Sequence, residues 1–132
     1  MYKILSLTLA LLFTPLWISA CSAHDDDNII STTEAYQIWS QQDKSSFVFL
    51  DVRTPDEYQD GHIPGAINMP IQTLSEHLKN VPKNKPLYLY CESGVRASRA
   101  ASLLRSAGFK EVYNYEASMR GWRKAHYPIA TH

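Results

Sequence analysis

The sequence lacks the features that mark several common classes of protein. It has no Gly-rich nucleotide-binding fingerprint, no Cys/His spacing typical of a metal site and no internal repeat. Its 13 basic and 13 acidic residues balance, so the charge gives no indication of a nucleic-acid partner. With 132 residues, of which 45% are hydrophobic and 20% charged, the chain is long enough for one globular domain with its own core. We expect one such domain, with neither a metal site nor a nucleic-acid site.

The first 20 residues are typical of a signal peptide. Lys3 precedes an apolar run from 4 to 20 that carries no charge and ends in small residues. Because this run is short for a membrane span and contains Pro15, a cleaved signal is favoured over a transmembrane helix. The four residues that end at Cys21 resemble the lipobox of bacterial lipoproteins, which implies cleavage before Cys21 and lipidation of that residue. The alternative is ordinary secretion with cleavage nearby.

Cysteine is scarce, because Cys21 and Cys91 are the only two in the chain. If Cys21 carries lipid, Cys91 is the only free thiol of the mature protein and no internal disulfide can form. An unpaired thiol in an oxidising exported compartment favours a chemical role for Cys91, and a buried structural cysteine is the alternative. Residues 21–28 are polar and predict a tether. We therefore expect an exported, periplasmic protein held at the bacterial membrane by a lipid anchor, with its folded domain in residues 29–132.

Apolar runs of strand length alternate with helical patterns from Ile29 onward. Continuous apolar runs predict strands buried on both faces, as in a parallel sheet covered by helices. Capping boxes, in which Ser or Thr stands three residues before Glu, predict the starts of three helices. We expect strands at 47–52, 66–69, 87–90 and 111–115, and helices at 32–41, 55–61, 73–80, 96–107 and 119–125, with Gly108 as a C-cap. This alternation predicts an open α/β sheet with helices on both faces and a ligand site beyond the carboxyl ends of its strands.

Residues 87–97 are typical of a strand, a tight loop and the start of a helix. Cys91 stands where the apolar run ends, so it meets the loop N–H groups and the positive end of the next helix. Both favour a thiolate and form a pocket for an anion. Gly94 permits the positive φ that brings the amides together. We therefore predict that Cys91 is a nucleophile and that the loop binds the substrate through Glu92, Ser93, Gly94, Val95, Arg96 and Ala97.

Several other polar and aromatic residues are interpreted as structural supports. Asp51 ends a predicted strand, and Arg53 two residues later predicts a buried ion pair or loop brace, with a direct chemical role for Asp51 as the alternative. Arg53 and Glu57, four residues apart, also fit an ion pair. His62 in a Pro/Gly turn is interpreted as a hydrogen-bonded brace. The large aromatic residues are interpreted as core or pocket wall: Trp39, Tyr88, Tyr90 and Trp122.

Four spaced motifs resemble the rhodanese family of sulfurtransferases over residues 29–128. They are Asp51-Val-Arg53, Glu57-Tyr58, Gly61-His-Ile-Pro-Gly-Ala-Ile-Asn68 and Cys91-x-x-Gly-x-Arg96. The resemblance is nearest to exported single-domain rhodaneses, and it implies a rhodanese-like, mainly parallel five-stranded sheet. It also implies transfer of a sulfane sulfur from thiosulfate or a related donor to cyanide or a thiol, through a persulfide on Cys91 and without a cofactor.

The same resemblance implies the partners. We expect a small anionic sulfur donor, a thiol or a thioredoxin-like protein as acceptor, and a monomer. Arg96 is expected to bind the sulfonate of the donor, with a brace of the loop or a merely solvated side chain as the alternatives. Arg99, one helical turn later, fits a rim charge or an ion-pair partner equally well. Glu92 departs from the basic residues that rhodaneses active on thiosulfate often carry near the cysteine. Its carboxylate is expected to oppose both an anionic donor and thiolate formation.

Two alternative functions stay open. One is a persulfide carrier that accepts sulfur from one protein partner and passes it to another. The other is a cysteine phosphatase or arsenate reductase on the same fold. Those enzymes use Cys-x5-Arg, whereas four residues separate Cys91 from Arg96 in this sequence. The shorter loop favours a pocket suited to one sulfur atom.

Overall fold

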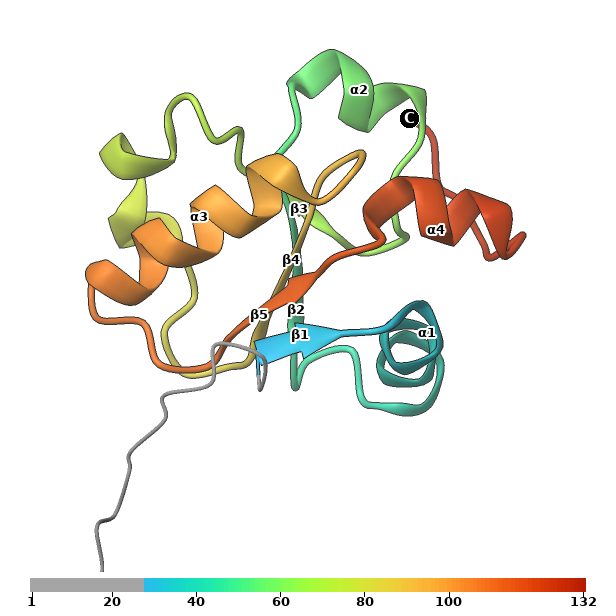
Figure 1. Cartoon of the computed structure of the whole chain (residues 1–132), viewed down its shortest axis with the longest axis horizontal. Helices are drawn as coiled ribbons and strands as arrows, with labels where there is room; N and C mark the ends of the chain where they lie inside the picture. Colours follow the sequence, from blue (N-terminus) through green and yellow to red (C-terminus); the bar gives the residue numbers. More distant parts are fainter. Residues whose placement is uncertain (1–27) are drawn as a thin grey trace, which may run out of the picture.

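The computed structural model describes residues 28–132, which build one five-stranded sheet with helices packed on it (Figure 1). Neighbouring strands run parallel in the order β1-β5-β4-β2-β3. The strands are β1 (Ile29–Ile30), β2 (Val48–Asp51), β3 (Ile67–Asn68), β4 (Leu87–Tyr90) and β5 (Val112–Tyr115). The α-helices are α1 (Thr32–Gln41), α2 (Pro55–Asp60), α3 (Val95–Ser106) and α4 (Ser118–Lys124), and two 3-10 turns follow β3, η2 (Leu74–Glu76) and η3 (Leu78–Asn80).

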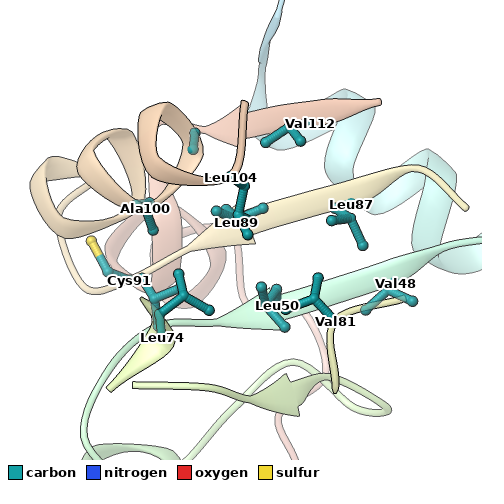
Figure 2. Close-up of a cluster of buried hydrophobic side chains, with 13 residues drawn as sticks. Val48, Leu50, Leu74, Val81, Leu87, Leu89, Cys91, Ala100, Leu104 and Val112 are labelled. Carbon is teal, nitrogen blue, oxygen red and sulfur yellow. The ribbon is translucent and has the colours of Figure 1, made fainter. Parts of the chain in front are cut away.

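Helices cover both faces of the sheet, so the predicted α/β architecture is confirmed. In Figure 1, α3 and the 3-10 turns lie on one side of the strands, and α1 and α4 lie on the other. On the α3 side, residues that alternate along β2 and β4 form an apolar cluster with Leu74, Ala100 and Leu104. Figure 2 shows Cys91 at the end of the row that Leu87 and Leu89 make along β4.

The opposite face of the sheet is mainly aromatic. Phe49, Tyr88 and Tyr90 alternate with the residues of the first cluster and form a second cluster with Trp122 of α4, whose side chain is fully buried. Trp39 of α1 is partly buried against the same group. The interpretation of these aromatic residues as core or wall is confirmed. Side chains of β2 and β4 contribute to the clusters on both faces of the sheet. All eight residues of these two strands are therefore buried, as expected for a parallel sheet covered by helices.

Local sequence signals place most helix boundaries correctly. The capping box of Ser31 and Glu34 starts α1 and that of Thr54 and Glu57 starts α2, with reciprocal side-chain hydrogen bonds in both. Helix α1 covers the predicted residues 32–41 and β4 the predicted residues 87–90. Outside residues 73–80, the other predicted boundaries differ by at most one residue. Helix α3 ends one residue early, so Ala107 is its C-cap and Gly108 follows at φ +95°.

The helix predicted at 73–80 is wrong, because this segment forms the two separate 3-10 turns η2 and η3. Thr73 has φ −118° and ψ 2°, outside the extended conformation that an N-cap requires, and its side chain makes no capping bond. Instead its hydroxyl contacts the carbonyl of Pro70 at 3.5 Å. The short turns bury Leu74 and Val81 against the sheet from a segment bounded by Pro70 and Pro82.

The expected signal peptide (1–20), the lipidation site Cys21 and the expected tether up to residue 27 lie outside the described residues. Within residues 28–132, no helix has the length and apolar character that a membrane span needs. The carboxyl ends of β2 and β4 are adjacent in the sheet, because Asp51 is paired with Tyr90 in the parallel register. Asp51 and Cys91 therefore come to the same edge, where the sequence predicted the site.

Candidate active site

The segment from Cys91 to Arg96 runs from the end of β4 through a tight loop into the first turn of α3. Gly94 is the N-cap of α3 with φ +96°, and its N–H donates a hydrogen bond to the Cys91 Sγ at 3.0 Å. A Cβ on Gly94 would overlap the carbonyl oxygen of Glu116, so only glycine fits this turn. The residue Cys91 is 1% exposed. The predicted positive φ at Gly94 is confirmed, and it aims one loop amide at the sulfur.

Most other amides of this loop are unoccupied. Within residues 28–132, the N–H groups of the remaining loop residues have no hydrogen-bond acceptor: Glu92, Ser93, Val95, Arg96 and Ala97. They lie at the N-terminus of the 12-residue helix α3, where the helix dipole favours negative charge. The loop can therefore receive an anion next to Cys91. Contact of each of these residues with a substrate stays a prediction.

Ser118 is part of the site, although the sequence did not indicate it. Its hydroxyl accepts a hydrogen bond from the Cys91 N–H at 3.1 Å, donates to the Tyr115 carbonyl at 2.9 Å and lies 3.9 Å from Sγ. The side chain is fully buried and the backbone has φ +52°, which costs a residue other than glycine about 1 kcal/mol. Because Ser118 lies 27 positions after Cys91 in the sequence, no local pattern could have revealed the contact.

Asp51 and Arg53 form a buried ion pair, as predicted. Both side chains are buried, with the Arg53 Nη2 2.6 Å from the Asp51 Oδ2 and the Arg53 Nε 2.9 Å from Oδ1. Arg53 also donates to the carbonyl of Gly61 at 2.7 Å, which ties the end of β2 to the segment after α2. Burial lowers the pKa of Arg53, but the hydrogen bonds and charge of Asp51 outweigh it and hold the pKa above its ordinary value. The pair is therefore a charged brace beneath the site.

His62 belongs to the same support. Its Nδ1 lies 2.8 Å from the carbonyl oxygen of Tyr58, and its ring stacks on the Tyr58 ring with centroids 3.7 Å apart. Its backbone pairs with Ala130 in both directions at 2.9 Å, which holds the C-terminal segment beside it. These contacts are those of the hydrogen-bonded brace expected from the Pro/Gly turn.

Glu92 is paired with arginine on both sides. Its carboxylate accepts bonds from the Arg123 Nη1 at 2.6 and 2.8 Å, and the Arg53 Nη1 lies 3.8 Å from the Glu92 Oε2. Taken alone, the Glu92 carboxylate is expected to repel an anionic donor. Arg123, which comes 31 residues later on α4, offsets that charge.

Arg96 forms an ion pair with Glu57 and makes no hydrogen bond to Cys91. Its two Nη atoms donate to the two carboxylate oxygens of Glu57 at 2.8 and 3.2 Å. These bonds are the main reason that the pKa of Glu57 lies below its ordinary value. The alternative pairing of Glu57 with Arg53 is not formed, because the carboxylate is bound to Arg96 from across the loop. Arg99 is exposed and makes no ion pair within the described part of the chain, which fits a rim charge.

No set of three or more His, Cys, Asp or Glu side chains within residues 28–132 is arranged to hold a metal ion. The site consists instead of one cysteine with hydrogen-bond donors around its sulfur. Such a site suits a nucleophilic thiolate and the anions that react with it.

Comparison with known proteins gives relatives for most of this chain. YqhL, an uncharacterized protein of Bacillus subtilis, is 42% identical over 73 residues, which are 55% of this chain and 58% of YqhL. Thiosulfate sulfurtransferase GlpE of Coxiella burnetii is 35% identical over 101 residues, 76% of this chain and 91% of GlpE. The putative sulfur carrier protein YrkF of Bacillus subtilis is 33% identical over 103 residues, 75% of this chain and 55% of YrkF. The relatives therefore include both an enzyme and a putative carrier.

Solved structures agree with the fold described above. The crystal structure of a rhodanese-related protein from Thermoplasma volcanium superposes with a TM-score of 0.71 at 27% identity, covering 80% of this chain and 99% of that one. The family model of the rhodanese-like domain matches residues 34–125, which include most of α1, the Cys91 loop and α4. The chain belongs to the rhodanese-like domain family.

Proposed function

We propose that this protein is a sulfurtransferase that moves a sulfane sulfur from thiosulfate, or a related small anionic donor, to a thiophilic acceptor. The reaction runs as a double displacement, with Cys91 as the residue that carries the sulfur between the two steps. Membership of the rhodanese-like domain family and the similarity to GlpE support this class of reaction. No oxidant or reductant is needed, because each step exchanges one bond to sulfur for another.

In the first step the Cys91 thiolate attacks the outer sulfur of thiosulfate. A bond forms between Sγ and that sulfur, the sulfur–sulfur bond of the donor breaks, and sulfite leaves with the electron pair. In the second step cyanide or a thiol attacks the outer sulfur of the persulfide, and the Cys91 thiolate leaves. The product is thiocyanate from cyanide or a new persulfide from a thiol.

The observation that carries the proposal is the hydrogen bond from the Gly94 N–H to the Cys91 Sγ at 3.0 Å, within a loop of four residues between Cys91 and Arg96. Thiolate and persulfide anions are both stabilised by N–H donors. The unoccupied amides of the loop supply further donors for the negative charge of the donor or of the persulfide. The Glu92–Arg123 pair also supports an anionic donor, because Arg123 offsets the charge of the carboxylate that follows the cysteine in sequence.

A persulfide carrier is the second candidate. Because Cys91 is 1% exposed, its sulfur must be delivered and removed either by a small anion that enters the loop or by a partner protein that inserts its own thiol there. YrkF, whose name describes a putative sulfur carrier, is a relative of this chain. A cysteine phosphatase or arsenate reductase is less favoured, because the loop is one residue shorter than Cys-x5-Arg.

Thiocyanate formation from thiosulfate and cyanide tests the proposal. The full chain, its Cys91→Ser variant and its Cys21→Ser variant are compared at matched concentration. We expect turnover by the wild type and by Cys21→Ser, and none by Cys91→Ser. Equal activity in Cys91→Ser would overturn the proposal. Stoichiometric loading of Cys91 without turnover would select the carrier, and a phosphatase rate above the thiocyanate rate would select the third candidate.

The predicted location and assembly extend the proposal. We propose export to the periplasm, lipidation at Cys21 and a monomeric domain that meets a thiol or thioredoxin-like acceptor at the membrane. The lipobox-like ending at Cys21 supports the anchor. Metabolic labelling with a fatty acid should label the wild type and not Cys21→Ala, and label that survives this substitution would contradict the anchor.

A further inference from the structure

We propose that Ser118 is a positioning residue for Cys91, whose hydroxyl donates a hydrogen bond to the Cys91 sulfur when that sulfur carries a negative charge. This inference rests on the proposed function, because it assigns a role at the same cysteine. It adds a residue from another element, since Ser118 begins α4 whereas Cys91 follows β4.

Ser118 contacts Cys91 at two atoms. Its Oγ accepts from the Cys91 N–H at 3.1 Å and lies 3.9 Å from Sγ, within hydrogen-bonding reach of a sulfur acceptor. The next residue, Met119, donates its N–H to the Cys91 carbonyl at 3.0 Å. The start of α4 therefore holds both the N–H and the C=O of Cys91. Ser118 is fully buried, so water does not compete for its hydroxyl.

The Ser118 hydroxyl has one proton and two groups that can accept it. In the structure the Tyr115 carbonyl accepts it at 2.9 Å. A thiolate or persulfide is the stronger acceptor, because hydrogen bonds to a charged group are about twice as strong as bonds between neutral groups. Rotation about the Cβ–Oγ bond redirects the proton from Tyr115 to Sγ when the sulfur ionises. Gly94 and Ser118 then both donate to Sγ.

The backbone conformation is an independent reason to assign a role to this side chain. Ser118 has φ +52°, in the left-handed region where glycine is the unstrained choice. Glycine would make the turn without strain, but the buried Cys91 N–H would lose its acceptor and Sγ its second donor. A strained residue beside a reactive group persists when its side chain has a task. Here that task is to hold and stabilise the sulfur.

The pH dependence of Cys91 alkylation tests the role directly. Full-length wild type, Ser118→Gly and Ser118→Ala are treated with iodoacetamide across a pH series, and the modified peptide is quantified by mass spectrometry. Trypsin releases Cys91 in a peptide of residues 84–96 and Cys21 in another, so the two thiols are read separately. Ser102→Ala is the matched control, because it removes an exposed hydroxyl that bonds a carbonyl of α3 away from the cysteine.

Both Ser118 variants keep every charged group around the cysteine. Those groups are Glu92 and Arg96 in the loop, Asp51 at the end of β2, Arg53 after it, Glu57 on α2, Arg99 on α3, Glu116 after β5, and Arg120 and Arg123 on α4. A shifted midpoint therefore reports the lost hydroxyl. We expect the alkylation midpoint to rise by about one pH unit in both variants, with about a tenfold lower rate at neutral pH.

Ser118→Gly separates this role from a purely structural one. It relieves the strained backbone and removes the hydroxyl, so a structural role alone predicts the wild-type alkylation midpoint, whatever the change in stability. A wild-type midpoint in either folded variant overturns the proposal, as does an equal shift in Ser102→Ala. Thermal unfolding identifies the folded variants. Alkylation does not involve sulfur transfer, so a wild type that never forms thiocyanate would refute the proposed function and leave this result standing.

Discussion

Replacing Asp51 with asparagine is expected to lower the free energy of unfolding by about 3 kcal/mol, the lower end of the cost of breaking a buried ion pair. The substitution keeps the size of the side chain and one oxygen. It removes the charge that faces Arg53, whose side chain is 1% exposed. The variant therefore leaves a buried guanidinium without its main counter-ion.

The size of the effect follows from the contacts of the pair. An asparagine oxygen can still accept from the Arg53 N–H and Nε, which lie 3.0 and 2.9 Å from the Asp51 Oδ1. The bond of 2.6 Å from the Arg53 Nη2 to Oδ2 is lost, and an amide NH2 group faces the guanidinium instead. The carbonyl of Gly61 and, at 3.8 Å, the carboxylate of Glu92 still contact the guanidinium. These remaining partners place the cost near the lower end of the range.

Equilibrium unfolding in urea measures the loss. With an m-value of about 1.5 kcal/mol/M, a loss of 3 kcal/mol moves the midpoint down by about 2 M urea. Asp60→Asn is the matched control, because Asp60 is exposed and makes no ion pair within the described residues. Its midpoint should stay at the wild-type value. A loss below about 1 kcal/mol for Asp51→Asn, the size of an exposed ion pair, would refute the brace interpretation.

Three further predictions concern the loop and its rim. Gly94→Ala should lower the free energy of unfolding by more than about 1 kcal/mol, because it adds a left-handed φ penalty to the overlap with Glu116, and a urea midpoint at the wild-type value would contradict this. Arg123→Ala should slow the loading of Cys91 by thiosulfate and Glu92→Gln should speed it, and stopped-flow assays should show both effects weaken at high salt. Rate changes in the same direction for the two variants would refute the view that these charges act on the anionic donor. Because the pKa of Glu57 is lower in the folded state than its ordinary 4.5, its stabilising contribution is present above that pH and is lost as the pH falls through the folded-state pKa. Glu57→Gln should thus unfold more easily than wild type at neutral pH, by less than about 1 kcal/mol for this partly exposed pair, and the difference should vanish in acid.

Much of the fold could be predicted from the sequence, because its signals are local. The apolar runs of β2 and β4 predict strands buried on both faces, and the capping boxes at Ser31 and Thr54 specify where α1 and α2 begin. Strand β1 has only two residues, Ile29 and Ile30, and the polar residues around them form no apolar run that would predict a strand. The segment that begins at Thr73 has the residue types of a capping box. Its backbone dihedral angles are not those of an N-cap, because they depend on how the segment packs.

The candidate site divides in the same way. Cys91 and Gly94 lie in one continuous stretch, so the place of the cysteine at the end of a strand and the positive φ of the glycine could be predicted together. The partners that complete the site come from α4, where Ser118 contacts Cys91 and Arg123 contacts Glu92, 27 and 31 residues away in sequence. Spacing along the chain gives no information about these contacts. They depend on how α4 packs at the end of the sheet.

The most direct test of the central claim is the mass of Cys91 after exposure to thiosulfate. The full-length wild type, Cys21→Ser and Cys91→Ser are incubated with thiosulfate and digested, and the peptide of residues 84–96 is measured without reduction. Persulfide formation predicts an increase of about 32 Da on that peptide in the wild type and in Cys21→Ser, none in Cys91→Ser, and its disappearance after cyanide is added. An unmodified Cys91 in a wild type that still produces thiocyanate would contradict the account.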